Sequence, residues 1–285
     1  RVARVTPSGA GRTGFTELSN AATGIQFTNV LTFEKSSANQ NLLNGAGLAV
    51  GDYDGDGRCD VYFCNLEGRN ALYRNLGNWQ FADVTDSAGV GASGKSSTGA
   101  TFADVNGDGR LDLVVTTCGN GNRVFLNTGA GRFQETLLPP GILTRTGSTT
   151  IALADIDGDG DLDLYIANYG ENSILRTGGT IATRTVDGQE VVVGRYRNRV
   201  KIAQGKMIEL GEPDVLYLND GQGGFSPVSW TDGHFLDEDG RPLAEAPWDE
   251  GLSAIFHDLN GDGAPDIYVC NDFQTPDRIW MNDGK

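Results

Sequence analysis

Short apolar runs rich in β-branched and aromatic residues recur along the chain, and each follows a polar loop. The four clearest runs are residues 61–63, 113–115, 164–166 and 267–269. Such runs favour β-strands, because β-branched and aromatic side chains fit a pleated, half-buried surface. The pattern therefore predicts an all-β protein in which each polar loop leads into a strand.

The loop before each run is a nine-residue acidic motif that occurs four times, as residues 52–60, 104–112, 155–163 and 258–266. Positions 1, 5 and 9 are Asp, position 3 is Asp or Asn, and positions 4 and 6 are Gly. Calcium takes about six to eight oxygen ligands, and glycine accepts the positive φ that a tight curl requires. The motif predicts one calcium ion in each loop, about four ions in all.

We expect the side chains at positions 1, 3, 5 and 9 to bind the ion, together with the backbone carbonyl of position 7, where the side chain varies. The predicted ligands are Asp52, Asp54, Asp56, Arg58 and Asp60; Asp104, Asn106, Asp108, Arg110 and Asp112; Asp155, Asp157, Asp159, Asp161 and Asp163; and Asp258, Asn260, Asp262, Ala264 and Asp266. An EF-hand needs a Glu at position 12, whereas this chain has Phe63, Val115, Ile166 and Val269 there.

The alternative interpretation of the loops is a set of Asx-rich turns without metal, since Asp, Asn and Gly favour turns in any case. Four copies favour calcium, because crowded carboxylates repel one another unless a cation is present. Magnesium fits less well, since it demands a stricter octahedron.

A second motif follows each loop: an aromatic residue, any residue, Asn, any residue and Gly. Its copies begin at Tyr73, Phe125, Tyr217 and Trp280. Asn and Gly between two strand-like runs predict a hairpin turn, so each unit is expected to contain four strands. Four-stranded units of about 50 residues, repeated, predict a β-propeller.

The spacing between the two motifs locates a large insertion. From loop end to aromatic residue there are 13 residues in units one and two and 54 in unit three. The chain is therefore predicted to be a single domain over 1–285, with four blades and an insertion at 171–213. We expect these blades to be part of a seven-bladed ring. The chain ends in mid-blade, and residues 15–33, which resemble the fourth-strand segment 81–90, are expected to supply the closing strand.

The insertion is predicted to form a β-hairpin, with strands at 180–186 and 190–196 around Asp187-Gly188. The cations that follow alternate along the chain, so they are expected to point to one face of a strand. They form the candidate partner surface, for a protein or an acidic glycan: Arg195, Arg197, Arg199 and Lys201. The alternative is a solvated face or pairing with the protein's own carboxylates.

The formal net charge is −16, and calcium in the four loops would cancel about half of it. The chain lacks the basic footprint of a nucleic-acid-binding protein. Calcium modules of this kind work at the high calcium concentration outside cells, so the protein is expected to be exported, to the extracellular space, the cell surface or the periplasm. No apolar stretch is long enough to predict a transmembrane segment.

The four cysteines leave two interpretations open. Cys64 and Cys270 occupy the same repeat position and are expected on inner strands of different blades as buried free thiols. Cys59 with Cys118 is a candidate disulfide that the sequence does not establish.

The acidic loop within a repeat of roughly 50 residues resembles the FG-GAP repeats of integrin α-subunit propellers and the VCBS repeats of bacterial surface proteins. The stretches 15–60 and 215–221 are more narrowly similar to the ASPIC/UnbV group of cartilage acidic protein-like chains. The resemblance implies a β-propeller whose calcium ligands fall on the loop positions given above, and it does not specify an activity. The C-terminal ASPIC-type module expected after such a propeller is absent from the sequence.

No catalytic constellation is found in the sequence. There is neither a Gly-x-Ser-x-Gly nor a His-Glu-x-x-His motif, and the two histidines are His234 and His257. The favoured function is a non-catalytic, calcium-stabilised binding or scaffold module of an exported or cell-surface assembly. The alternative is the propeller of a secreted carbohydrate-active enzyme, such as a polysaccharide lyase, in which Arg197 and Lys201 would neutralise a uronate.

Overall fold

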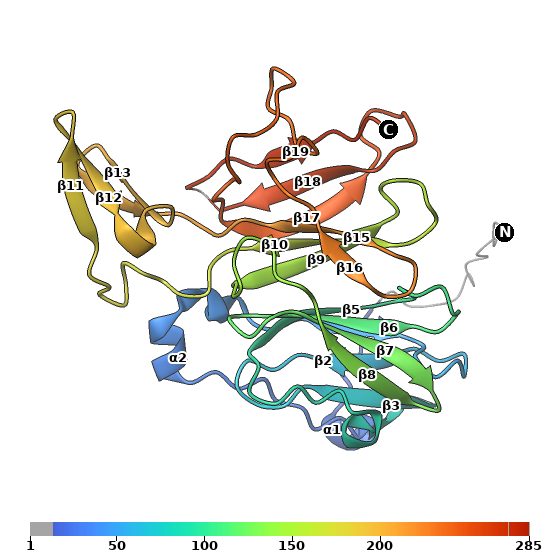
Figure 1. Cartoon of the computed structure of the whole chain (residues 1–285). Coiled ribbons are helices and arrows are strands. Elements are labelled where there is room, and N and C mark those ends of the chain that lie inside the picture. The colour runs from blue at the N-terminus through green and yellow to red at the C-terminus, as the bar shows by residue number, and fades with distance from the viewer. Residues whose placement is uncertain (1–13, 273, 285) are drawn as a thin grey trace.

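The computed structural model describes residues 14–272 and 274–284, and it is built from antiparallel sheets that follow one another through the molecule (Figure 1). The four larger sheets each correspond to one predicted blade, which confirms the all-β, propeller-type fold class. Blade 1 comprises β1 (Leu48–Gly51), β2 (Asp60–Phe63), β3 (Ala71–Gly77) and β4 (Gln80–Asp83), and blade 2 comprises β5 (Ser97–Ala103), β6 (Asp112–Thr117), β7 (Arg123–Gly129) and β8 (Arg132–Leu137).

Blade 3 has the strand order β16-β15-β10-β9, because the insertion separates its second and third strands. Its strands are β9 (Ser148–Ala154), β10 (Asp163–Asn168), β15 (Val215–Asn219) and β16 (Phe225–Pro227). Within the described residues, blade 4 has three strands, β17 (Gly251–His257), β18 (Asp266–Asn271) and β19 (Arg278–Trp280). The described residues thus form four blades and no closed ring, and a seven-bladed ring stays a prediction.

The blades pack through apolar layers and through hydrogen bonds between their first strands. Tyr62 of blade 1 and Phe125 of blade 2 belong to one buried apolar cluster, and Tyr165 of blade 3 and Ile267 of blade 4 belong to another. The first strands are joined directly, since the Thr98 hydroxyl donates to the Ser148 carbonyl (2.7 Å) and the Thr149 hydroxyl donates to the Gly251 carbonyl (2.9 Å). Strands β1, β5, β9 and β17 therefore line the inner side of the blades.

The N-terminal segment corrects the prediction of a closing strand over 15–33. Ser19 instead caps the short helix α1 (Asn20–Thr23), which ends at Gly24 with φ 79°. The chain then runs along blade 1, and its backbone forms hydrogen bonds with side chains of that blade. For example, the Gln26 amide donates to the Tyr73 hydroxyl (3.1 Å). The likeness to residues 81–90 holds only in its second half, where α3 (Thr85–Ala88) also ends at a glycine with positive φ. Helices α2 (Phe33–Ala38) and η1 (Gln40–Asn44) follow.

The insertion projects from the side of the propeller as two hairpins (Figure 1). Strands β11 (Ala182–Val186) and β12 (Gln189–Val193) form the predicted hairpin, and β13 (Val200–Ala203) pairs with β14 (Lys206–Glu209). The predicted alternation of four cations on one strand is wrong. Residues 194–196 form the 3-10 helix η2 (Gly194–Tyr196), because the chain turns at Gly194 with φ 79°, so only Lys201 lies in a strand.

All four cysteines are free thiols, so the candidate disulfide between Cys59 and Cys118 is wrong. Cys59 is exposed in the first acidic loop, whereas Cys118 lies near Glu171 and accepts a hydrogen bond from Asn39. Cys64, directly after β2, is buried between blades 1 and 2 as predicted, whereas Cys270 on β18 is only half-buried. The predicted inner-strand position is wrong for both, since β2 and β18 are the second strands of their blades. No helix among the described residues is long and apolar enough to cross a membrane.

Candidate metal centres

Each acidic loop connects the first and second strands of its blade and curls around its first aspartate. In the first loop, the Asp52 carboxylate accepts hydrogen bonds from the Asp56 amide (3.0 Å) and the Gly57 amide (2.8 Å). Gly55 and Gly57 adopt φ of 73° and 86°, a backbone conformation that residues with a Cβ rarely adopt. The same curl recurs around Asp104, Asp155 and Asp258.

The curl brings carboxylate oxygens together in two of the loops. One oxygen from each of Asp52, Asp54 and Asp60 lies within 4.8 Å of the others, and the same holds for Asp155, Asp157 and Asp159. The second and fourth loops carry Asn106 and Asn260 at position 3, so an amide oxygen replaces one carboxylate there. Converging oxygens of this kind fit a hard cation such as calcium.

The last aspartate of each loop is buried at the start of the second strand. Asp60, Asp112, Asp163 and Asp266 are all inaccessible to solvent. In the first loop, Asp60 accepts hydrogen bonds from the Tyr53 amide (3.2 Å) and the Asn75 amide (2.7 Å). This pairing, from position 2 and from the Asn of the second motif, is the same in all four blades.

Burial makes the last aspartates of the first three loops, Asp60, Asp112 and Asp163, hard to ionise without a cation. It raises the pKa of Asp60 to about 6, and the nearby Asp54 and Asp56 charges act in the same direction, although the two amide hydrogen bonds oppose them. Burial likewise raises the pKa values of Asp112 and Asp163. A bound cation would favour the ionised form and offset this cost, so the electrostatics of the loops suit a metal.

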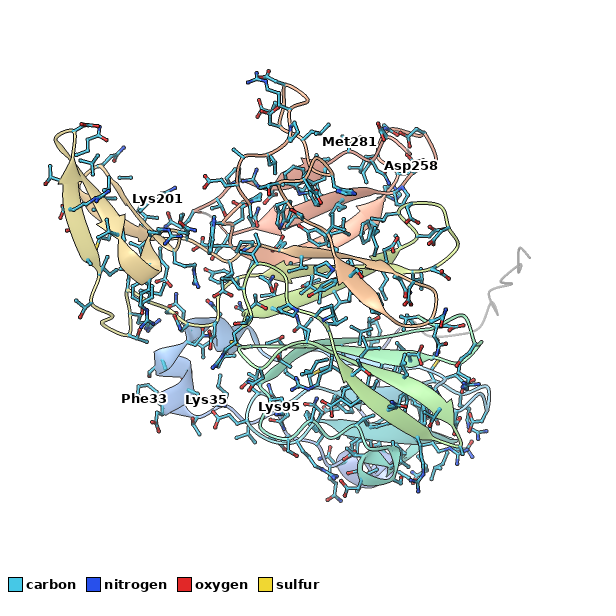
Figure 2. The ribbon with its side chains drawn as sticks, viewed as in Figure 1. Phe33, Lys35, Lys95, Lys201, Asp258 and Met281 are labelled. Carbon is cyan, nitrogen blue, oxygen red and sulfur yellow. The ribbon has the colours of Figure 1, made fainter. Side chains whose placement is uncertain are left out.

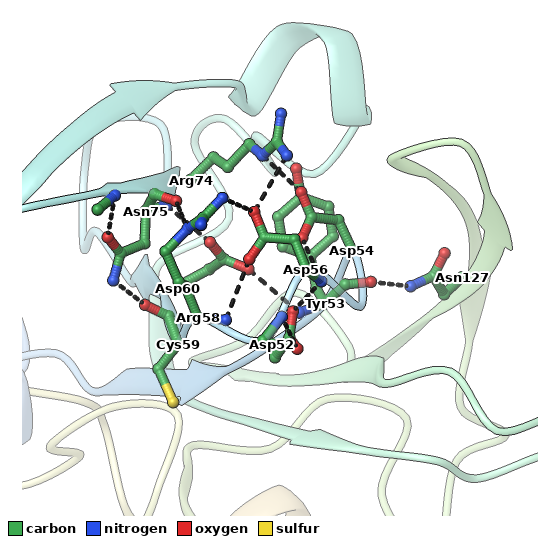
Figure 3. A network of polar contacts seen from close by, with 12 residues as sticks. Asp52, Tyr53, Asp54, Asp56, Arg58, Cys59, Asp60, Arg74, Asn75 and Asn127 are labelled. Carbon is green, nitrogen blue, oxygen red and sulfur yellow. Dashed lines mark hydrogen bonds and ion pairs between the residues drawn. The ribbon is translucent and has the colours of Figure 1, made fainter.

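The asparagines of the second motif belong to the site, although the sequence indicated only a turn. The Asn127 side-chain amide donates to the Leu111 carbonyl of its own loop (3.0 Å) and to the Tyr53 carbonyl of the preceding loop (2.8 Å; Figure 3). Asn219 reaches the carbonyl of Val105 and Asn282 that of Ile156 in the same way. Each bridge therefore ties one loop to the next. The repeated Asn was the signal that could have revealed it.

Arginines pair with the first two loops only. Arg58 and Arg110, at position 7, contact Asp56 and Asp108 of their own loops. Arg74, from β3, places its Nε 2.5 Å from Asp54 Oδ2 and its Nη2 3.1 Å from Asp56 Oδ2 (Figure 3). Across residues 14–272 and 274–284, no arginine or lysine forms an ion pair with a carboxylate of the third or fourth loop.

The candidate partner surface lies at the opposite side from the loops. Strand β10 begins at the third loop and leads into the insertion, and Lys201 and Asp258 are on opposite sides of the molecule (Figure 2). Arg195 and Arg197 are exposed on the turn around η2, and the Arg195 guanidinium lies over the Tyr196 ring, 4.4 Å from its centre. Arg199 is turned inward instead.

Arg199 joins the insertion to the propeller. Its guanidinium pairs with Glu212, whose side chain is 2% exposed, and its Nε donates to the Leu210 carbonyl (3.0 Å). Glu212 also accepts hydrogen bonds from the Gly147 amide (2.8 Å) and the Glu171 amide (2.9 Å). One of the four predicted partner-binding cations is therefore occupied by the protein's own carboxylate.

Comparison with known families identifies the repeats. The model of the FG-GAP-like repeat matches residues 52–115 and 104–166, and that of the FG-GAP repeat matches residues 148–188. These matches cover the first three acidic loops, and they confirm the resemblance that the sequence predicts.

Curated relatives show the same likeness. The chain is 31% identical to cartilage acidic protein 1 of Mus musculus over 132 residues, which is 45% of this chain and 20% of that protein. It is 33% identical to cartilage acidic protein 1 of Xenopus tropicalis over 127 residues, or 44% of this chain and 20% of the relative. The match therefore spans about a fifth of the length of these relatives.

Among solved structures, the chain resembles the Tc holotoxin pore of Photorhabdus luminescens at a TM-score of 0.37 and 19% identity, over 83% of this chain and 9% of the other. It resembles a biofilm matrix protein of V. cholerae at a TM-score of 0.36 and 17% identity, over 85% of this chain and 37% of the other. TM-scores this low do not support a functional comparison.

Proposed function

We propose that this FG-GAP-type repeat domain is a calcium-stabilised, non-catalytic binding module of an exported protein. The observation that supports the proposal is the buried aspartate that ends each acidic loop. In the first and third loops, three carboxylates of the loop also converge. Each aspartate holds its own loop and the adjacent strand by amide hydrogen bonds. Calcium at these sites would stabilise the strand connections of the blades, so its role is structural.

The proposed binding surface is the insertion. It carries seven of the 22 basic residues of the chain within residues 171–213, beside five acidic ones. Arg184, Arg195, Arg197, Lys201 and Lys206 are all exposed on it. A cationic element on an acidic domain suits a partner with negative charge, such as an acidic glycan or an acidic protein surface, in a larger extracellular or cell-surface assembly. Binding elements held by rigid scaffolds are common in proteins.

Thermal unfolding of the protein with increasing calcium tests the metal part of this proposal. We expect the midpoint temperature to rise with calcium, because a ligand that binds only the folded state stabilises it by mass action. Magnesium at the same concentrations should act much more weakly. Asp60→Asn removes a loop carboxylate that is buried, and this variant should lose part of the calcium response. An unchanged midpoint across millimolar calcium would overturn the proposal.

A second experiment separates binding from catalysis. Retention on an acidic polysaccharide column, with and without calcium, is compared between the wild type and a variant with Arg195, Arg197 and Lys201 changed to Ala, and release of oligosaccharides is measured in parallel. We expect retention without cleavage, and reduced retention of the variant. Calcium-dependent cleavage would favour a carbohydrate-active enzyme instead.

A further inference from the structure

Blade 1 has one arginine outside its acidic loop that the later blades do not have. The first two acidic loops both have Arg at position 7, where Arg58 and Arg110 make equivalent contacts. Blade 1 has Arg74 immediately before the Asn of the second motif, whereas the matching positions of the later blades are Leu126, Leu218 and Met281.

The Arg74 guanidinium occupies carboxylate oxygens that a metal ion would need. It contacts Asp54 at 2.5 Å and Asp56 at 3.1 Å, and these are positions 3 and 5 of the loop. Figure 3 shows Arg74 directed at both carboxylates. Two positive charges attract the same oxygens and repel each other, so calcium and the guanidinium compete for this loop.

The structure provides space into which the guanidinium can withdraw. A cavity of ≈ 540 Å³ lies between the first and second loops, lined by Asp54, Arg74, Arg110 and Arg132 among others. Arg74 is 40% exposed, so leaving the loop does not require the core to open. The cost of withdrawal is the loss of two ion pairs, with Arg110 and Arg132 as neighbours of the same sign.

We infer that Arg74 is a tethered counter-cation that competes with calcium in the first loop and makes it a weaker site than the same loop without that arginine. This inference rests on the proposed calcium binding. Its consequence is that the four sites are not equivalent, because the third and fourth loops have no such arginine pair. The first site should then need more calcium to fill than the same loop would need without Arg74.

Terbium luminescence sensitised by tyrosine can follow the first loop separately. Only this loop has an aromatic residue at position 2, Tyr53, whereas the others have Val105, Ile156 and Leu259. The part of the luminescence that Tyr53→Phe removes reports the first loop. Calcium competition then gives the affinity of that loop, while calorimetry gives total calcium binding.

Arg74→Leu, which copies the second and third blades, should lower the calcium midpoint of the Tyr53-dependent signal about five- to tenfold, as expected for the loss of partly exposed ion pairs. Arg74→Gln should act in the same direction, which guards against a folding defect of the leucine variant. Arg132→Leu is the matched control, since Arg132 lines the same cavity, and it should leave the midpoint unchanged.

The outcomes distinguish the two proposals. Unchanged Tyr53-dependent midpoints in both Arg74 variants, with normal total calcium binding, would overturn the role of Arg74 and leave the calcium module intact. A wild type that binds no calcium by calorimetry would overturn both. A shift produced equally by Arg132→Leu would mean that general surface charge, and not competition for the loop carboxylates, sets the affinity.

Discussion

The side-chain amide of Asn127, on the third strand of blade 2, donates a 2.8 Å hydrogen bond to the backbone carbonyl of Tyr53, in the first loop of blade 1 (Figure 3). The Tyr53 amide is itself bonded to Asp60. One peptide segment is thus held from its own loop and from the neighbouring blade. The loops therefore form a hydrogen-bonded series around the rim, linked by a residue that the acidic motif does not contain.

The first prediction concerns this bridge. Asn127→Ala removes bonds to Tyr53 and Leu111, whereas Asn75→Ala removes the bond to Cys59 within one blade. We expect Asn127→Ala to reduce the free energy of unfolding by about 1–2 kcal/mol more than Asn75→Ala, because it leaves a buried carbonyl without its donor. Urea unfolding at saturating calcium measures the difference. Equal losses would mean that the bridge adds no stability between blades.

The second prediction concerns Arg199. Arg199→Ala leaves the Glu212 carboxylate, which is 2% exposed, without its cation, and loss of one partner of a buried pair costs about 3–5 kcal/mol. Arg197→Ala, two residues earlier and exposed, should change the stability little. Thermal unfolding of both variants provides the comparison. If Arg199→Ala were as stable as Arg197→Ala, the attachment of the insertion would not depend on this pair.

The third prediction is a pH dependence that arises from Asp214. Burial raises its pKa to about 7, although hydrogen bonds from the Asn168 amide and the Tyr165 hydroxyl oppose the shift. Since the folded state holds this proton more tightly than the unfolded state, the contribution of Asp214 to stability is full below about pH 4 and is lost as the pH rises to about 7.

Asp214→Asn should therefore reduce the decline in stability between pH 4 and pH 8. Between pH 4 and pH 8 the stability of the variant relative to the wild type should rise by about 2–4 kcal/mol. Chemical unfolding across this pH range, with calcium held at saturation, checks the difference. Parallel pH profiles of the two proteins would contradict the assignment.

The fourth prediction concerns the close approach of the insertion to blade 4. A Cβ at Gly211 would lie 1.6 Å from the Asp249 carbonyl oxygen, so the backbone must move to accommodate any side chain. Gly211→Ala should destabilise the protein by about 3 kcal/mol or more. Gly188→Ala, in the open hairpin turn with φ 78°, should cost only about 1–2 kcal/mol. A reversed order, measured by thermal unfolding, would argue against this contact.

The sequence predicted the strands and loops because their signals are local. The nine-residue spacing and the apolar run that follows it specify a turn and a strand within one segment, so all four blades were found. The stripe over residues 195–201 was mistaken for a strand, because the positive φ of Gly194 starts a turn and because Glu212, distant in sequence, attracts Arg199. The role of Asn127 depended on the position of a neighbouring blade, which no local pattern contains.

The asparagine bridge also gives the row of blades a direction, because every bridge runs from one blade to the blade before it. Leu259 occupies position 2 of the fourth loop, the place whose carbonyl receives the asparagine of the following blade in the other three loops. Each blade therefore has a direction at its rim. Its loop carbonyl accepts a hydrogen bond from the blade after it, and its asparagine amide donates one to the blade before it. Concatenated or permuted arrays of these blades should therefore keep every unit joined head to tail, so that each asparagine faces the loop carbonyl of the unit before it.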